Sequence, residues 1–203
     1  NRYYLKGLRE AEKHVAESIA ALSFGQESYK EYRTDLAQTI MDTYHVHFSP
    51  EQREAFSLLE SPGVKVLIGD PGTGKTTTVK GLVEAFRIMK PGAEILLCAP
   101  TGRAAQRMSE ATGRDAYTIH RLLEFTKGKG SLNENLATKA LKADLYVIDE
   151  SSMINIELAD AFLKEIKPGA TVIFVGDEKQ LPSVEAGNFL HDLIRCGILP
   201  VVE

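Results

Sequence analysis

The sequence predicts an α/β fold, in which a mainly parallel sheet is flanked by helices and preceded by a small helical N-terminal unit. From Val64 onward, short apolar runs alternate with amphipathic helical segments, the pattern of parallel strands joined by crossover helices. Before that point, apolar residues recur at helical spacing only. Two helical segments end in the same Lys-Pro-Gly sequence, at Lys90 and Lys167, so one kind of helix-to-strand connection is used twice.

Two sets of apolar residues predict two helices in residues 1–46, which we expect to form a unit separate from residues 47–203. The first set is Leu5, Leu8, Val15, Ile19 and Leu22, and the second is Tyr29, Tyr32, Leu36 and Ile40. The pattern then breaks near His45. Ser49, Pro50 and Gln52 form an S-x-x-Q capping box with proline at the first helical position, so a third helix begins there.

The strands are predicted from apolar runs that are too short to be helices. Residues 126–143 contain two glycines and little periodicity, which indicates a loop or small hairpin inserted before the third strand. The last residues of the chain are apolar again and predict one more strand. The strands expected from the runs are Val64–Ile68, Ile95–Ala99, Leu145–Ile148 and Thr171–Val175, with the final one at 201–203.

Composition limits the class of protein. The chain has 203 residues, 43% of them hydrophobic and 26% charged, which is ordinary for a globular domain. Its apolar runs are far shorter than the ~20 residues of a membrane-spanning helix, so we expect no membrane association. Two cysteines are too few for a disulfide scaffold and favour a reducing compartment. The chain begins without Met or a signal peptide, and we expect it to be part of a longer protein.

Charge is unevenly distributed along the chain. The net charge of -4 argues against a protein that coats nucleic acid nonspecifically. Between Thr101 and Lys142, however, basic residues outnumber acidic ones. That segment could therefore line a basic groove within an acidic protein.

The most informative motif is a phosphate-binding loop. Residues 69–76 read GDPGTGKT, which matches G-x-x-x-x-G-K-[ST] and lies between a predicted strand and a predicted helix. Glycines allow consecutive backbone N–H groups to face phosphates at the helix N-terminus. Lys75 would offset β- and γ-phosphate charge, and Thr76 could ligate Mg²⁺. The alternative is a glycine-rich turn with an exposed lysine. The residues expected to bind the nucleotide here are Gly72, Thr73, Gly74, Lys75, Thr76 and Thr77.

Polar side chains follow two other predicted strands. Asp149 and Glu150 end the third strand, which places two carboxylates at the carboxyl edge of the sheet, beside the phosphate loop. Asp149 suits the magnesium shell and Glu150 suits activation of an attacking water. After the fourth strand, Gln180 has the neutral hydrogen-bonding chemistry that a γ-phosphate sensor needs. A helix cap for the acidic pair, and a solvent-exposed position for Gln180, are the alternatives.

Five further residues have two interpretations each. Gln52 could complete the capping box or recognise adenine. Thr101, Gly102 and Arg103 follow the second strand and could contact the phosphates of a single strand, or form an ordinary helix cap with a solvated arginine. His120 could contact the same ligand or be a core histidine. The five His and two Cys show no ligand spacing that would indicate a metal site of their own.

Taken in order, five segments resemble the motifs of RecD-like DNA helicases of superfamily 1, most closely the stand-alone RecD type. The resemblance covers the chain from Ser49 to about Leu199, and the first and last segments after the phosphate loop are more specific than the loop itself. The segments are SPEQ at 49–52, GDPGTGKTTT at 69–78, CAPTGRAAQRMSEATGRDAYTIHRLL at 98–123, LYVIDESSM at 145–153 and VIFVGDEKQLPSVEAGNFLHDLI at 172–194.

The resemblance implies an ATP-driven motor with Mg²⁺ as its metal, moving 5′ to 3′ along single-stranded DNA in the bacterial cytoplasm, with DNA-repair proteins as possible partners. It assigns adenine recognition to Gln52, hydrolytic roles to Asp149 and Glu150, and coupling of nucleotide state to DNA grip to Gln180. It places residues 126–143 where the family has a small hairpin subdomain. The residues that match DNA-contacting positions of the family are Thr101, Gly102, Arg103, Thr118 and His120.

The resemblance also implies a fold of two RecA-like domains, of which residues 47–203 are the first and the second is absent. In this family the second domain supplies arginine fingers, worth about 10³ to 10⁵ in rate. We therefore expect little hydrolysis by this chain alone. A subunit of a helicase-nuclease complex, the helicase part of a relaxase, and a non-catalytic nucleotide-gated DNA-binding module are the alternatives. No N-K-x-D segment follows the third strand, which argues against a GTPase.

Overall fold

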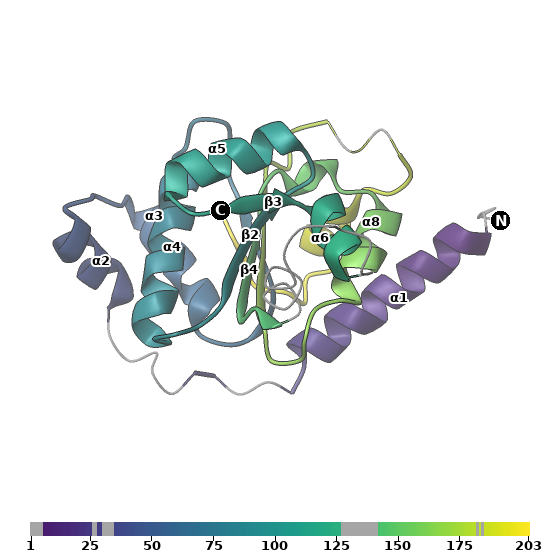
Figure 1. The fold of residues 1–203 in the computed structure, drawn as a ribbon, viewed down its shortest axis with the longest axis horizontal. Helices are drawn as coiled ribbons and strands as arrows, with labels where there is room; N and C mark the ends of the chain where they lie inside the picture. Colours follow the sequence, from purple (N-terminus) through teal and green to yellow (C-terminus); the bar gives the residue numbers. More distant parts are fainter. Residues whose placement is uncertain (1–5, 26–27, 30–34, 127–141, 182, 184) are drawn as a thin grey trace.

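In the computed structural model the described part of the chain contains one sheet of six parallel strands, in the order β3-β2-β4-β5-β1-β6. Figure 1 labels β2, β3 and β4, with helices on both sides. The structure describes all residues except 1–5, 26–27, 30–34, 127–141, 182 and 184. The predicted α/β class with a parallel sheet is confirmed. The strands are β1 (Gly63–Ile68), β2 (Ile95–Ala99), β3 (Ala116–Thr118), β4 (Leu145–Ile148), β5 (Thr171–Gly176) and β6 (Val201–Val202).

Helices cover both faces of the sheet. One face packs against α2 (Leu36–Tyr44), η1 (Ala55–Leu59), α4 (Lys75–Met89) and α5 (Gly102–Thr112), and these elements share one hydrophobic core with it. The other face packs against α1 (Lys6–Ser23), α6 (Ile119–Thr126), α8 (Ile156–Leu163) and α9 (Phe189–Arg195). Alternate residues of β1 belong to different cores: Val66 faces the second group and Leu67 the first. Burial on both faces explains why the strands are continuous apolar runs.

Four of the five predicted strands match the structure within one residue, and the last, predicted at 201–203, is β6. β3 was not predicted. It has three residues, lies at one edge of the sheet and is only half-buried, so Ala116, Tyr117 and Thr118 form no apolar run. The predicted insert at 126–143 lies almost entirely outside the described residues.

The N-terminal helices lie on opposite faces of the sheet (Figure 1). α1 packs along α8 and β1, with Val15, Ile19 and Leu22 at helical spacing in the core. α2 packs against α4 on the other face. Each helix therefore contributes to a core that it shares with the sheet. The boundary between a helical unit and a motor domain at residues 46 and 47 stays a prediction.

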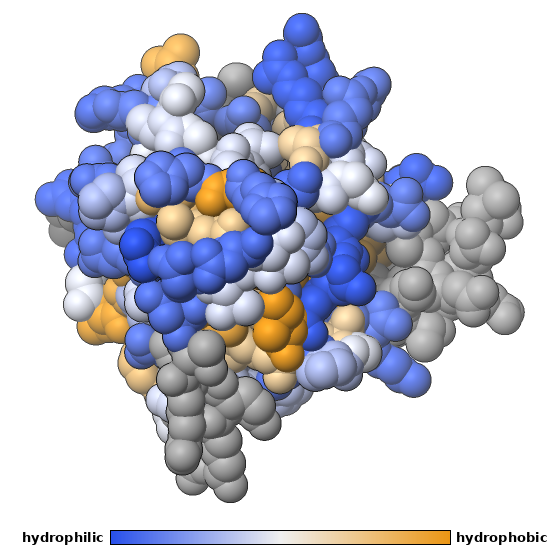
Figure 2. Space-filling view, turned by 90° about the vertical axis from the view of Figure 1, so that its left-hand side faces the viewer, coloured by the Kyte–Doolittle hydropathy of each residue, from blue (hydrophilic) through white to orange (hydrophobic). Residues whose placement is uncertain are grey.

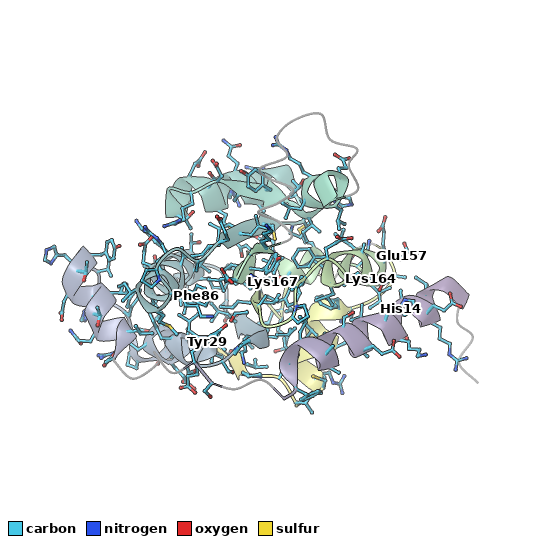
Figure 3. The ribbon with its side chains drawn as sticks, turned by 60° about the horizontal axis from the view of Figure 1, so that its bottom comes forward. His14, Tyr29, Phe86, Glu157, Lys164 and Lys167 are labelled. Carbon is cyan, nitrogen blue, oxygen red and sulfur yellow. The ribbon has the colours of Figure 1, made fainter. Side chains whose placement is uncertain are left out.

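The second predicted helix begins later than its apolar pattern indicated. Asp35 caps α2 by accepting the Gln38 amide at 2.9 Å, and Tyr29 lies outside the helix. The Tyr29 ring lies edge-on to the Phe86 ring, with centroids 6.1 Å apart (Figure 3). The Tyr29 hydroxyl and the Thr171 hydroxyl are 2.9 Å apart, and the Lys90 ammonium lies 3.9 Å from the Tyr29 ring centroid. Tyr29 therefore packs against α4 and the start of β5 through tertiary contacts. Its helical spacing from the residues of α2 was misleading. Tyr32 falls outside the described residues.

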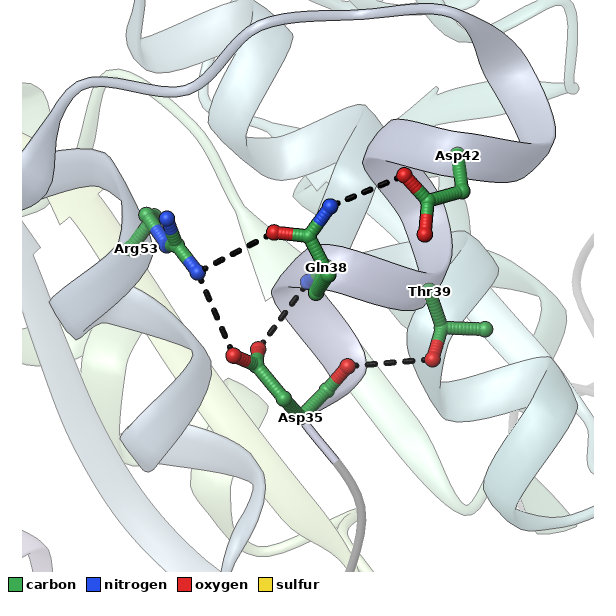
Figure 4. A network of polar contacts seen from close by, with 5 residues as sticks. All are labelled: Asp35, Gln38, Thr39, Asp42 and Arg53. Atoms are coloured by element: carbon green, nitrogen blue, oxygen red, sulfur yellow. Dashed lines mark hydrogen bonds and ion pairs between the residues drawn. The ribbon is translucent and has the colours of Figure 1, made fainter.

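A polar network ties α2 to the third helix, α3 (Pro50–Glu54) (Figure 4). Arg53 donates to the Asp35 carboxylate at 3.2 Å and to the Gln38 side-chain oxygen at 3.4 Å. Gln38 in turn donates to Asp42 at 2.8 Å. The surface on the side of α2 and α3 is mostly hydrophilic, with small apolar patches between polar side chains (Figure 2). Through Arg53 the network holds α3, which carries Gln52, against the start of α2.

None of the helices that the structure describes is both long enough and apolar enough to cross a bilayer.

Candidate active site

The phosphate loop joins β1 to α4 and depends on two glycines in the left-handed region. Gly72 has φ 82° and Gly74 has φ 84°, values that L side chains rarely adopt. Thr73 closes the turn by donating its hydroxyl to the Asp70 carbonyl at 2.8 Å. α4 begins directly afterwards at Lys75, so its first backbone N–H groups face the loop. The loop has the shape and polarity that bind phosphates.

Lys75 points into this loop. Its ammonium donates to the carbonyl oxygens of Gly69 and Asp70, the latter at 2.8 Å. Thr76 and Thr77 follow in the first turn of α4, and both are exposed. An ammonium held by carbonyls at the loop entrance can exchange those acceptors for phosphate oxygens.

A cavity of about 420 Å³ opens beside the loop, a size suited to a nucleotide. Gln52 lines it and makes two side-chain hydrogen bonds, one of which is the predicted cap. Its side-chain oxygen accepts the Ser49 amide at 3.0 Å, which completes the capping box. Its side-chain amide donates to the Thr73 carbonyl at 3.2 Å, which ties α3 to the phosphate loop. Gln52 is thus both a cap and a wall of the cavity.

The acidic pair lies at the same edge of the sheet. β5 lies between β4 and β1, so the ends of β4 and β1 are two strand spacings, roughly 10 Å, apart. Burial raises the pKa of Asp149, and the nearby Glu150 charge adds to this, while the Glu150 amide and the Lys75 charge lower it. Asp149 accepts that amide at 2.9 Å. Glu150 has φ 53°, uncommon for a residue with a side chain.

The loop after β5 contacts its neighbours on both sides. Gln180 accepts a hydrogen bond from the Ser152 hydroxyl at 2.6 Å, on the β4 side. Lys179 forms an ion pair with Asp70 at 2.8 Å, on the β1 side. Asp177, which is buried, holds the turn by accepting the Lys179 amide at 2.8 Å.

The candidate DNA-contacting residues lie at the carboxyl ends of the adjacent strands β2 and β3. Thr101 caps α5 by accepting the Ala104 amide at 3.3 Å, so the cap interpretation is correct for its hydroxyl. Thr118 likewise accepts the Arg121 amide at 3.1 Å. Gly102 and Arg103 are exposed.

His120 is also exposed, and the alternative of a core histidine is wrong because its neighbour Ile119 takes the buried position. A second depression, of about 280 Å³, lies between α5 and β3 and is lined in part by Gly102 and Thr118. The candidate DNA surface is therefore at the same sheet edge as the nucleotide cavity, toward the β3 end.

No role was predicted for Asp70, Ser152 or Lys179 from the sequence, whereas Asp177 was expected among the polar groups at this edge of the sheet. Asp70 is inside the phosphate-loop motif, and Ser152 lies two residues after the acidic pair, so their positions could have drawn attention. Nothing in the sequence indicates that Lys179 reaches a residue 109 positions away. That contact depends on the order of strands in the sheet.

The sequence model of the family described as AAA domain matches residues 52–186. The chain belongs to this family. It is also homologous over most of its length to the RecD and Pif1 helicases of superfamily 1, and it has their RecA-like motor fold. The resemblance seen in its motifs is thus confirmed.

Two curated relatives and one solved structure illustrate the homology. The ATP-dependent RecD2 DNA helicase of Deinococcus radiodurans is 38% identical over 196 residues, 97% of this chain and 26% of that protein. The RecBCD enzyme subunit RecD of Mycolicibacterium smegmatis is 39% identical over 166 residues, 71% of this chain and 30% of that protein. The crystal structure of Bacteroides Pif1 bound to single-stranded DNA has a TM-score of 0.50 and 26% identity, covering 75% of this chain and 37% of that one. The chain therefore spans less than a third of the length of these curated relatives.

Proposed function

We propose that this chain is the ATP-binding motor domain of a bacterial cytoplasmic DNA helicase that moves 5′ to 3′ along single-stranded DNA, in DNA repair or recombination. The observation that carries the proposal is that the phosphate loop, the acidic pair and Gln180 follow strands β1, β4 and β5, which are neighbours in a parallel sheet. Ligands of open parallel sheets bind at that edge. The homology to ATP-dependent helicases supports the same conclusion.

The residues at this edge fit ATP with Mg²⁺. Lys75 and the N-terminus of α4 would hold the phosphates, while Thr76 and Asp149 would provide oxygen ligands for the metal. When bound, Mg²⁺ neutralises charge on the phosphates. Burial raises the pKa of Asp149 because the charged carboxylate is partly desolvated, and a cation beside it would relieve that penalty. The donor set therefore suits a hard cation.

Hydrolysis would depend on Glu150 and Gln180. The left-handed backbone at Glu150 turns the chain sharply after β4 and sets the direction of its carboxylate, which would accept a proton from the attacking water. Gln180, held by Ser152, would sense the γ-phosphate and pass its presence to the DNA surface. Gln52, already in contact with the phosphate loop, would recognise adenine.

Single-stranded DNA would cross the ends of β2 and β3. Gly102 and Arg103 at the start of α5 offer a backbone amide and a guanidinium to phosphates, with Thr101, Thr118 and His120 beside them. A second RecA-like domain of the same polypeptide would close both clefts and supply the arginine finger. The chain alone would then hydrolyse ATP slowly or not at all.

One alternative has specific support. The 39% identity to a RecBCD subunit favours a motor subunit of a helicase-nuclease complex. Both functions need the same site, and they differ in whether the complete polypeptide unwinds DNA without partner subunits.

Equilibrium binding of a fluorescent ADP in the presence of Mg²⁺ tests the site in this chain. Lys75→Ala should weaken binding by at least about tenfold, the scale of a lost charge-assisted contact. Lys80→Ala, an exposed lysine on the same helix, serves as the matched control and should bind as the wild type does. Equal affinities for wild type and Lys75→Ala would reject the proposed site. Hydrolysis stimulated by single-stranded DNA, measured on a longer polypeptide that includes the second domain, then tests the motor function.

A further inference from the structure

An exposed ion pair crosses from the β5 loop to the phosphate loop. The Lys179 ammonium lies 2.8 Å from the Asp70 carboxylate, and the two side chains are 73% and 49% exposed. The hydrogen bond from Lys179 uses a side-chain oxygen of Asp70, whereas Lys75 donates to the backbone carbonyl of the same residue. Two lysines thus contact Asp70, one at its carboxylate and one at its backbone carbonyl.

The turn that carries Lys179 is well fixed. Asp177 is 6% exposed at the end of β5, its carboxylate accepts the Lys179 amide, and its carbonyl accepts the Gln180 amide at 3.3 Å. Two side chains of this turn point to opposite sides: Lys179 reaches the phosphate loop, and Gln180 reaches Ser152. Because β5 lies between β1 and β4, one turn contacts both halves of the proposed site.

Asp70 presents an electrostatic problem for a phosphate site. Asp70 lines the cavity beside the loop and its side chain is half-exposed, so a bound polyphosphate would meet a like charge there. Lys75 cannot remove this repulsion fully, because its ammonium is directed to the carbonyls and would be needed by the phosphates. A second cation on Asp70 would remove it.

We propose that Lys179 is a positioning residue of the nucleotide site, which neutralises Asp70 and holds its carboxylate away from the bound phosphates. The inference rests on the proposed function, since it assumes that a nucleoside polyphosphate occupies the cavity. Lys179 acts through Asp70 and needs no contact with the nucleotide. The hydrogen bond to Asp70 also raises the pKa of the Lys179 ammonium, so it stays charged at neutral pH.

A double-mutant cycle on nucleotide affinity tests this. Lys179→Ala should weaken binding of fluorescent ADP and of a nonhydrolysable ATP analogue roughly three- to tenfold at low salt, because it exposes one uncompensated charge. In an Asp70→Asn background the same change should have an effect of less than about twofold, because no carboxylate is left to neutralise. Lys179→Arg should restore wild-type affinity.

The control is Lys13→Ala, which removes an equally exposed lysine, 73%, from a surface ion pair with Glu17 on α1. It should leave affinity unchanged. A loss for Lys179→Ala that is equally large in both backgrounds would overturn the inference, because Lys179 would then contact the nucleotide directly. No loss in either background would also overturn it. If the wild-type chain binds no nucleotide, the proposed function itself fails.

Discussion

The Ser152 hydroxyl donates a 2.6 Å hydrogen bond to the side-chain oxygen of Gln180, and so joins the loop after β4 to the loop after β5. Ser152 is 7% exposed, whereas Gln180 is exposed, so a buried residue anchors an exposed one. Asp149 and Glu150 lie three and two residues before Ser152 in the chain. A movement of Gln180 would therefore shift Ser152, which lies close to the acidic pair in the chain.

Ser152→Ala should lower the free energy of unfolding by about 1 kcal/mol, the typical net value of one hydrogen bond. It should also narrow the difference in affinity between a nonhydrolysable ATP analogue and ADP, because a free Gln180 must be ordered when it binds the γ-phosphate, at a cost of about 0.5–1.5 kcal/mol. Urea unfolding and nucleotide titration measure the two effects. Ser57→Ala, an exposed serine in η1, should change neither. An unaltered ATP-to-ADP preference in Ser152→Ala would argue against Gln180 as the sensor.

Gly74→Ala should destabilise the phosphate loop for two separable reasons. A Cβ at this position would lie 2.5 Å from the Gln52 side-chain nitrogen, and the φ of 84° disfavours any L side chain by about 1–2 kcal/mol. Removing the Gln52 side chain in the double variant Gly74→Ala/Gln52→Ala should relieve only the steric part. Urea unfolding of both variants and of Gln52→Ala alone measures the difference.

Gly92→Ala is the control for this comparison. Its φ is 85°, but a Cβ there would meet nothing within 4 Å, so it should show the backbone cost alone. If Gly74→Ala and Gly92→Ala cost the same, the contact with Gln52 has no energetic weight.

Much of the fold could be predicted because buried parallel strands are continuous apolar runs, as at β2 and β4. β3 could not, since an edge strand of three half-buried residues has no such pattern. The start of α2 was misplaced because the spacing of Tyr29 mimics a helix, while its ring packs on Phe86 and its hydroxyl on Thr171. Periodicity does not distinguish these cases, because it records which residues are apolar and not what they pack against.

In the candidate site, too, local motifs could be predicted and contacts between distant segments could not. The phosphate loop and the acidic pair are local in sequence, and the parallel order of the sheet brings them together. The Lys179–Asp70 pair is different, because it exists only through the adjacency of β5 and β1. Contacts of this kind require the strand order, which no local pattern in the sequence specifies.

Gln52→Glu should separate the two roles of this residue. A glutamate keeps the oxygen that accepts the Ser49 amide, so the capping box and the stability should be retained within about 0.5 kcal/mol. It loses the amide donor that now reaches Thr73, and with it the paired donor and acceptor that adenine recognition needs. Preference for ADP over GDP, measured by competition, should fall about tenfold, the scale of one or two lost hydrogen bonds.

Two outcomes would contradict that expectation. An unchanged preference for ADP would limit Gln52 to capping. A large loss of stability in Gln52→Glu would show that the contact with Thr73, and not the cap, holds α3 against the loop.

Asp149→Asn should stabilise the chain at pH 7 in the absence of nucleotide. Burial and the Glu150 charge raise the pKa of Asp149 above its ordinary value of 3.8, so between that value and the raised pKa the folded state binds more protons than the unfolded state. Stability therefore falls as the pH rises through this window, and the wild type carries the full penalty above it. An asparagine has no such penalty and can still accept the Glu150 amide.

The difference in unfolding free energy between Asp149→Asn and wild type, followed by urea unfolding across pH, should vanish below pH 3.8 and grow to a plateau above the raised pKa. Asp144→Asn is the opposite control. Burial raises the pKa of Asp144, but the hydrogen bonds from Lys167 and the Glu94 amide, together with the Lys167 and Lys90 charges, lower it by more. The pKa of Asp144 in the folded state is therefore below its ordinary value, and the ionised carboxylate stabilises the fold at neutral pH. Asp144→Asn should therefore destabilise the chain at pH 7, and this loss of unfolding free energy should shrink as the pH falls.

Asp149 is also the proposed magnesium ligand. Of the two variants, only Asp149→Asn should lose the part of the ADP affinity that depends on Mg²⁺. If Asp149→Asn folds stably and its ADP affinity still depends on Mg²⁺, Asp149 is not part of the metal site.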